Sequence, residues 1–182
     1  MYVSRNLRKT NIAEYLLYMW QVEDLLRANG LDVDRIAENV VAKYQLDEAQ
    51  QNELTEWYAN LIEMMKHERL EKEGHLQINR NVLIELNDLH AQLIHSNKFP
   101  YYQSAYYKVL PYIVEIRAKS HTQNESELEN CFDTLYGVWM LRLQNKPLNP
   151  DTAEAVANIT TFIGMLSDYY QKDRNGELKI DE

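Results

Sequence analysis

The sequence predicts a single all-α domain, a bundle of about seven mostly antiparallel helices. Apolar residues recur at helical spacing along nearly the whole chain, and no alternating run of β-branched residues indicates a strand. The 182 residues include only 5 Gly and 4 Pro, so helix-breaking positions are few. Because the gaps between the periodic segments are short, neighbouring helices are expected to run antiparallel. We expect the domain to cover 1–172 and a polar tail to cover 173–182.

The first predicted helix spans 11–29, with Thr10 as its N-cap and Gly30 at its end. Its middle, from Tyr15 to Trp20, is apolar on every side of the helix. A helix of that kind lies either at the centre of a bundle or in an interface with a second chain.

Aspartates begin the next two predicted helices. Asp32 begins the second, where Leu31 and Ile36 have the spacing of a hydrophobic staple. Asp47 begins the third, and Gln50 completes a capping box three residues later. These local signals predict where both helices start.

Four more helices follow at similar signals. Asn79 is the predicted N-cap of the fourth, and Pro100 suits the first turn of the fifth. Pro111 lies inside the fifth, where it removes a backbone donor and is expected to kink the helix. The sixth is predicted to begin at Asn124 and the seventh at Asn149.

Small residues recur at helical spacing in the seventh predicted helix, and Gly137 lies inside the sixth. Small side chains let two helix axes approach closely. We therefore expect tight helix packing at these positions, which are Ala153, Ala157, Thr160 and Gly164.

Charge and cysteine content restrict the class of partner and the compartment. The formal net charge is −9, which repels nucleic acid and anionic membranes. The lone Cys131 forms no intramolecular disulfide, and its spacing from Leu128 predicts a small buried side chain. No run approaches the ~20 apolar residues of a membrane span. The sequence therefore predicts a cytoplasmic protein, and without a nucleotide-loop or zinc motif we expect no cofactor.

Three segments, 11–20, 74–79 and 106–111, resemble an uncharacterised Bacteroidota family, domain of unknown function 4924. The resemblance extends from the start of the chain to about residue 170. It implies an intact single-domain bacterial protein. It implies no activity, cofactor or catalytic residue.

The kink at Pro111 is the best candidate for a ligand pocket, because a proline in mid-helix leaves the carbonyl of Tyr107 without its usual donor. Cations and phenols nearby suit a small acidic or aromatic ligand. The alternative is a kinked core helix with a solvated polar face, a surface pair between Glu115 and Lys119, and a structural histidine. The candidate ligand-binding residues are Tyr107, Lys108, Tyr112, Glu115, Arg117 and His90.

Arg142 extends an apolar stripe and so is predicted either to point inward or to reach solvent at the end of its helix. An inward arginine needs a carboxylate partner. The first predicted helix supplies three candidates for this buried ion pair, Glu14, Glu23 and Asp24.

The C-terminal segment has part of the spacing of a calcium-binding EF-hand loop. Asp173, Asn175 and Glu182 occupy ligand positions, but Gln171 replaces the first aspartate. A frayed polar tail is the alternative.

The leading functional hypothesis is a non-catalytic interaction or scaffold protein, with a homodimer formed through the first predicted helix. It depends on the 13 Tyr and 3 Trp, residue types that interfaces favour. The alternative is a small-molecule binding protein or an unrecognised enzyme with a groove beside Pro111. A calcium sensor ranks third, and no catalytic residue is assigned.

Overall fold

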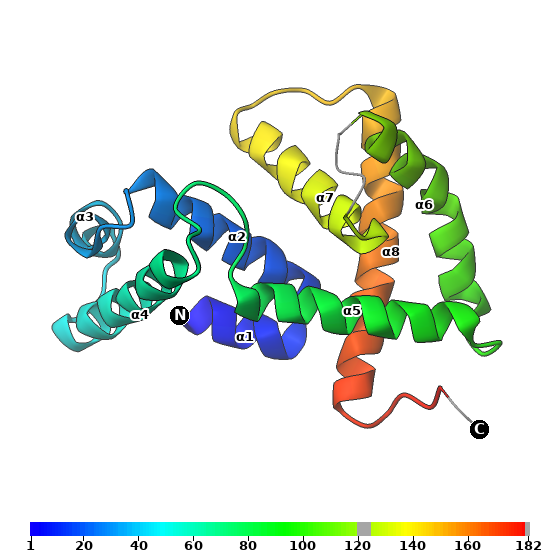
Figure 1. Cartoon of the computed structure of the whole chain (residues 1–182), viewed down its shortest axis with the longest axis horizontal. Coiled ribbons are helices and arrows are strands. Elements are labelled where there is room, and N and C mark those ends of the chain that lie inside the picture. Colours follow the sequence, from blue (N-terminus) through cyan, green and yellow to red (C-terminus); the bar gives the residue numbers. More distant parts are fainter. Residues whose placement is uncertain (120–124, 181–182) are drawn as a thin grey trace. The chain divides into compact units, whose positions relative to one another are not determined.

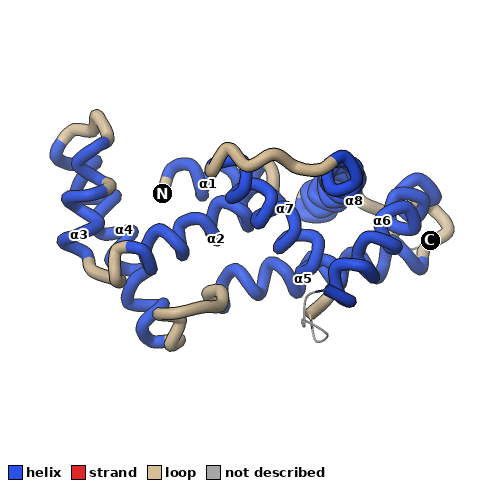
Figure 2. Tube along the Cα trace, turned by 90° about the horizontal axis from the view of Figure 1, so that it is seen from above, coloured by secondary structure: helices blue, strands red, loops and turns tan. Residues whose placement is uncertain are grey.

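A computed structural model describes residues 1–119 and 125–180, and in that part of the chain every regular element is a helix (Figure 1, Figure 2). The all-α prediction is confirmed. In chain order the elements are α1 Tyr2–Thr10, α2 Ile12–Ala28, α3 Val33–Asn39, the 3-10 helix η1 Val41–Lys43, α4 Glu48–His67, α5 Gln77–His95, α6 Pro100–Lys119, α7 Glu127–Leu143 and α8 Pro150–Arg174.

The residues group into two compact units. The first unit comprises Met1–Arg8 and Glu14–Asn81, and the second comprises Lys9–Ala13 and Val82–Glu182. Helices α1, α2 and α5 contribute residues to both units. A single domain over 1–172 stays a prediction, and α8 continues past the predicted boundary to Arg174.

The side chains of α2 are largely covered by the chain itself. Leu16, Met19 and Trp20 are all at most 2% exposed. These three side chains of α2 are therefore core residues, and a homodimer through this helix stays a prediction.

Local capping signals placed three helix starts correctly. Asp32 accepts hydrogen bonds from the first backbone amides of α3, and Asp47 and Gln50 form the expected capping box of α4. Asn149 caps α8, with Pro150 in its first turn. Helix α3 lies beside α4 in the first unit, as the blue ribbon of α3 and the cyan-to-green ribbon of α4 in Figure 1 show.

Other helix boundaries differ from the predictions. Helix α1 was not predicted, because its strongly basic sequence offers few apolar positions. Asn79 is not a cap, since α5 begins at Gln77 and Asn79 is buried in its first turn. Asn124 lies outside the described residues, and Ser126 caps α7 through a capping box with Glu129.

Helices α6, α7 and α8 pack against one another in the second unit. Tyr102 and Ile113 of α6, Phe132 of α7 and Phe162 of α8 form part of its core, each fully buried. Helix α6 continues through Pro111, whose ring is exposed. The structure describes no helix that is long and apolar enough to cross a membrane.

The small residues of α8 do not pack tightly against a neighbour, contrary to the prediction. Ala153, Ala157, Thr160 and Gly164 are all exposed. A Cβ atom added to Gly164 would meet no atom within 4 Å, and the same holds for Gly137. The periodicity therefore marks an exposed helix face.

Replacing Gly164 with alanine is expected to raise the free energy of unfolding by about 0.5–1 kcal/mol, because glycine loses more backbone entropy in a helix. Thermal unfolding measures the change. The matched control is Gly30→Ala, which should destabilise the chain because the φ of Gly30 is +70°. A destabilised Gly164→Ala chain would contradict the exposed assignment.

Candidate functional site

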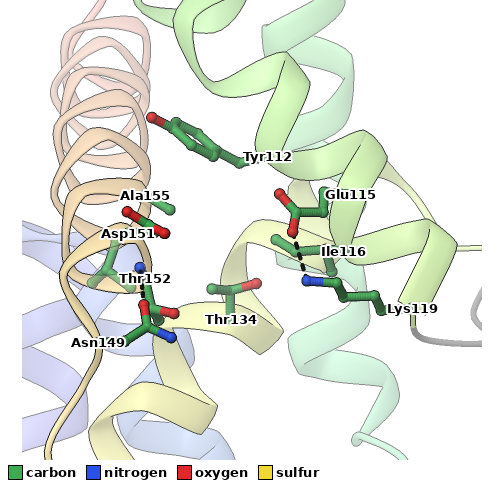
Figure 3. Close-up of a pocket in the computed structure, with 10 residues that line it drawn as sticks. Tyr112, Glu115, Ile116, Lys119, Thr134, Asn149, Asp151, Thr152 and Ala155 are labelled. Carbon is green, nitrogen blue, oxygen red and sulfur yellow. Dashed lines mark hydrogen bonds and ion pairs between the residues drawn. The ribbon is translucent and has the colours of Figure 1, made fainter.

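A pocket of about 270 Å³ lies between α6, α7 and α8, about one turn beyond Pro111 (Figure 3). Of the six candidate ligand-binding residues, Tyr112 and Glu115 line it, and the other four do not. Its walls also include residues that the sequence analysis did not assign to a site. These are Ile116, Lys119, Thr134, Asn149, Asp151, Thr152, Ala155 and Val156.

The polar side chains of the pocket already make internal contacts. Lys119 Nζ donates to Glu115 Oε1 at 2.5 Å, which confirms the predicted surface pair. Asn149 Oδ1 accepts from the backbone N–H of Thr152 at 2.7 Å. The broken lines in Figure 3 mark both contacts, one on each wall.

Arg117 joins α6 to the start of α7. Its Nε donates to Asn130 Oδ1 and its Nη2 donates to the backbone oxygen of Glu125, both at 2.6 Å. Glu127 Oε1 lies 4.0 Å from Nη1. The guanidinium is therefore committed to a structural role and does not face the pocket.

Tyr107 and Lys108 lie on the outer face of α6. Tyr107 is 61% exposed, and Lys108 is also exposed. Lys108 has no ion-pair partner within the described residues. Both side chains face solvent and not a groove.

His90 is a structural histidine, as the alternative reading predicted. Its Nδ1 lies 2.7 Å from the hydroxyl oxygen of Tyr102, and its ring meets Phe162 edge to face at 5.6 Å. Burial raises the pKa of Tyr102, so the hydroxyl stays protonated and can donate to a neutral imidazole. Burial also lowers the pKa of His90 from its usual 6.5.

Acidification is therefore expected to destabilise the chain through His90. The unfolded histidine binds a proton near pH 6.5 and the folded one only at lower pH, so stability falls as pH drops below about 6.5. Urea unfolding at about pH 7.5 and about pH 5.5 should show a smaller loss for His90→Gln than for the wild type. An equal loss in the two proteins would exclude this contribution.

Glu23 of α2 is fully buried and forms the centre of a polar cluster in the first unit. Its Oε2 lies 2.6 Å from His75 Nδ1. Its Oε1 accepts from the backbone N–H of Leu76 at 3.0 Å and from Asn79 Nδ2 at 2.7 Å. Trp20 stacks on the His75 ring at 4.1 Å. We call these residues the Glu23 cluster.

Arg142 lies in the second unit and its three candidate carboxylates lie in the first, so the buried ion pair stays a prediction. Arg142 is exposed in the last turn of α7, in line with the alternative that it reaches solvent. Within the first unit, Glu23 contacts His75, Asp24 lies 2.8 Å from Arg27, and Glu14 is exposed. An exposed guanidinium is hydrated by water and needs no buried carboxylate.

Cys131 is buried, as predicted. Burial raises the pKa of its thiol to about 12. At neutral pH the thiol is therefore protonated, and a protonated thiol is a poor nucleophile.

The C-terminal segment does not have the shape of a calcium loop. Gln171 and Asp173 belong to the last turn of α8, and Asn175 is its C-cap. The remaining candidate, Glu182, lies outside the described residues. No group of three His, Cys, Asp or Glu side chains in the described part of the chain is arranged to hold a metal ion.

Comparison with known proteins identifies a family. The model of a family described as "Domain of unknown function (DUF4924)" matches residues 1–177. This agrees with the resemblance seen in the sequence and extends slightly beyond it. No curated protein and no solved structure matches the chain.

Proposed function

The chain belongs to this family of unknown function, and because the family assigns no activity, we propose from the structure that it is an interaction protein that self-associates through the outer face of α6. The observation that carries the proposal is a row of exposed side chains on one helix. We call the row Tyr107, Pro111, Val114 and Ala118 the α6 ridge.

The α6 ridge combines exposure with an apolar surface. Tyr107 and Val114 are 61% and 60% exposed. Tyr101, on a neighbouring face of α6, is 83% exposed. Tyrosine is enriched at protein interfaces, and large apolar side chains gathered on one helix favour a partner over water.

The spacing of the ridge fits another helix. Its residues are four, three and four positions apart, the alternating spacing of the positions through which one helix packs along another. Helix α6 has 20 residues and is therefore about 30 Å long. A second α6 presents the same ridge, as a two-fold symmetric interface requires.

Charge favours an antiparallel pair that crosses near Pro111. Lys108 and Glu115 lie on the same flank of the ridge, and same-flank positions meet when two helices run antiparallel. Lys108 of one copy would then reach the second carboxylate oxygen of Glu115 of the other, twice in each dimer, while Glu115 Oε1 keeps its contact with Lys119 of its own copy. Of the three cations on the described α6, Lys108 is the one without an ion pair, since Arg117 and Lys119 each lie within 4.0 Å of a glutamate.

We expect the dimer to be weak. One helix face supports an interface at or below about 1,200 Å², the range of transient complexes. The net charge of −9 on each copy adds repulsion. The proposed location is the cytoplasm, where the lone Cys131 would stay reduced.

Analytical ultracentrifugation from about 10 μM to 1 mM tests the proposal, because a transient interface dissociates within this range. The wild-type mass should rise with concentration, and Val114→Glu should stay monomeric. Ile84→Glu is the matched control, since Ile84 is 54% exposed on α5, and this variant should associate like the wild type. A wild-type chain that is monomeric at 1 mM would overturn the proposal.

A charge exchange tests the antiparallel arrangement. Lys108→Glu and Glu115→Lys should each weaken association, because each places like charges together at both symmetric contacts. The double variant should restore it, because the opposite charges face each other again. A double variant as weak as the single ones would exclude this register.

A further inference from the structure

We propose that the pocket between α6, α7 and α8 binds a small polyhydroxylated amine, such as a protonated amino sugar. Tyr112, Thr134 and Asp151, which carry this inference, lie outside the α6 ridge. The inference therefore does not depend on self-association.

The size of the pocket sets the size of the ligand. Small-molecule sites usually enclose roughly 300–1,000 Å³, and this pocket encloses about 270 Å³. It therefore suits a molecule with one ring and not a dinucleotide. Ile116, Ala155 and Val156 supply apolar surface for the carbon skeleton of such a ring.

The charges of the pocket favour an ammonium group. Glu115 on the α6 wall and Asp151 on the α8 wall face each other across the opening (Figure 3). Lys119 neutralises Glu115 through the 2.5 Å contact. Asp151 has no ion pair within the described residues, so one carboxylate is left to bind a cation. A charge-assisted hydrogen bond is the strongest polar contact that this pocket offers.

The two hydroxyl groups of the pocket have opposite hydrogen-bonding roles left for a ligand. Tyr112 accepts from Asn158 Nδ2 at 3.4 Å, so its own proton remains to be donated to a ligand. Thr134 donates its proton to the backbone oxygen of Asn130 at 2.7 Å, so its oxygen remains to accept. A ligand that fits must both accept and donate, and alcohol groups do both.

Asn149 adds a second donor. Its Oδ1 is occupied by the backbone N–H of Thr152, so its amide hydrogens remain for the ligand. The set as a whole, one carboxylate, two donors, one acceptor and an aromatic wall at Tyr112, matches a ring that carries several hydroxyls and one ammonium group.

Isothermal titration calorimetry of the full chain with glucosamine and with glucose tests the inference. The two sugars have the same ring and differ in the ammonium group. We expect glucosamine to bind with a millimolar dissociation constant and about tenfold more tightly than glucose, because only glucosamine forms the charge-assisted bond to Asp151. No detectable heat of binding with glucosamine at up to about 50 mM would overturn the inference.

Two variants separate the roles of the pocket residues. Asp151→Asn should reduce the affinity for glucosamine to the affinity for glucose. Tyr112→Phe should weaken the binding of both sugars. Asp168→Asn is the matched control, because Asp168 is exposed on α8 and does not line the pocket. An Asp151→Asn chain that binds glucosamine like the wild type would also overturn the inference.

The Val114→Glu chain keeps the two proposals apart. Its substitution lies on the α6 ridge, so it should abolish self-association and leave glucosamine affinity unchanged. Thermal unfolding of each variant verifies that the pocket is still folded.

Discussion

Replacing Glu23 with alanine is expected to lower the free energy of unfolding by about 2–5 kcal/mol, because it leaves two buried donors without an acceptor, at about 1–3 kcal/mol each. Three groups lose their hydrogen-bond partner together: the Leu76 N–H, Asn79 Nδ2 and His75 Nδ1. A buried donor without a partner keeps its full desolvation cost. Urea unfolding monitored by the helical circular dichroism signal measures the loss.

Two variants calibrate this result. Glu23→Gln keeps one oxygen as an acceptor and should cost clearly less than alanine. Glu56→Ala removes an exposed carboxylate from α4 and should change stability by no more than about 0.5 kcal/mol. If Glu23→Ala were as mild as Glu56→Ala, the Glu23 cluster would contribute little to folding.

Replacing Phe162 with alanine is expected to cost about 3–5 kcal/mol of stability, the range for a large aromatic side chain removed from a core. Phe162 is fully buried, and its ring lies 5.3 Å from Tyr102 and 5.9 Å from Tyr106. The substitution would also remove the ring that packs edge to face on His90. For a chain of this length the melting temperature should fall by about 10 °C.

The control for this experiment is another aromatic side chain in the same unit. Tyr101 is 83% exposed, and Tyr101→Ala should change stability by no more than about 0.5 kcal/mol. Phe162→Leu fills most of the cavity, so its loss of stability should lie between those of Tyr101→Ala and Phe162→Ala. A Phe162→Ala chain that melts with the wild type would mean that the aromatic cluster is not part of the stable core.

Helix starts were predictable where the capping group is local. Asp32, Asp47 and Asn149 each cap a helix with their own side chain, so a window of a few residues contains the whole signal. The start of α5 was not predictable in this way. Its first amides bond to Glu23 and Glu68, which belong to other parts of the chain.

The Glu23 cluster left a partial signal in the sequence. Glu23 follows Leu16 by seven residues and Met19 by four, so it lies on the apolar stripe of its helix and needs a buried partner. The position of Glu23 on this stripe does not identify the partner. His75 is 52 residues away, and only the folded chain brings it to the carboxylate.

The pocket was predictable only on its α6 side. Tyr112 and Glu115 follow Pro111 within the next turn, so a pocket predicted at the proline includes them. Thr134 and Asp151 come from α7 and α8, and no local pattern links those residues to α6. The outward direction of Tyr107 was likewise open, because an aromatic residue at helical spacing suits a core and an interface equally.

The capping of α5 by other segments has a consequence for the order of folding. Glu23 and Glu68 both precede Gln77 in the chain, so during synthesis both carboxylates leave the ribosome before the helix that they cap. The first turn of α5 can close as soon as it emerges, provided that α2 and the end of α4 have already come together. A peptide that begins at His75 would lack both acceptors and would fray at this end.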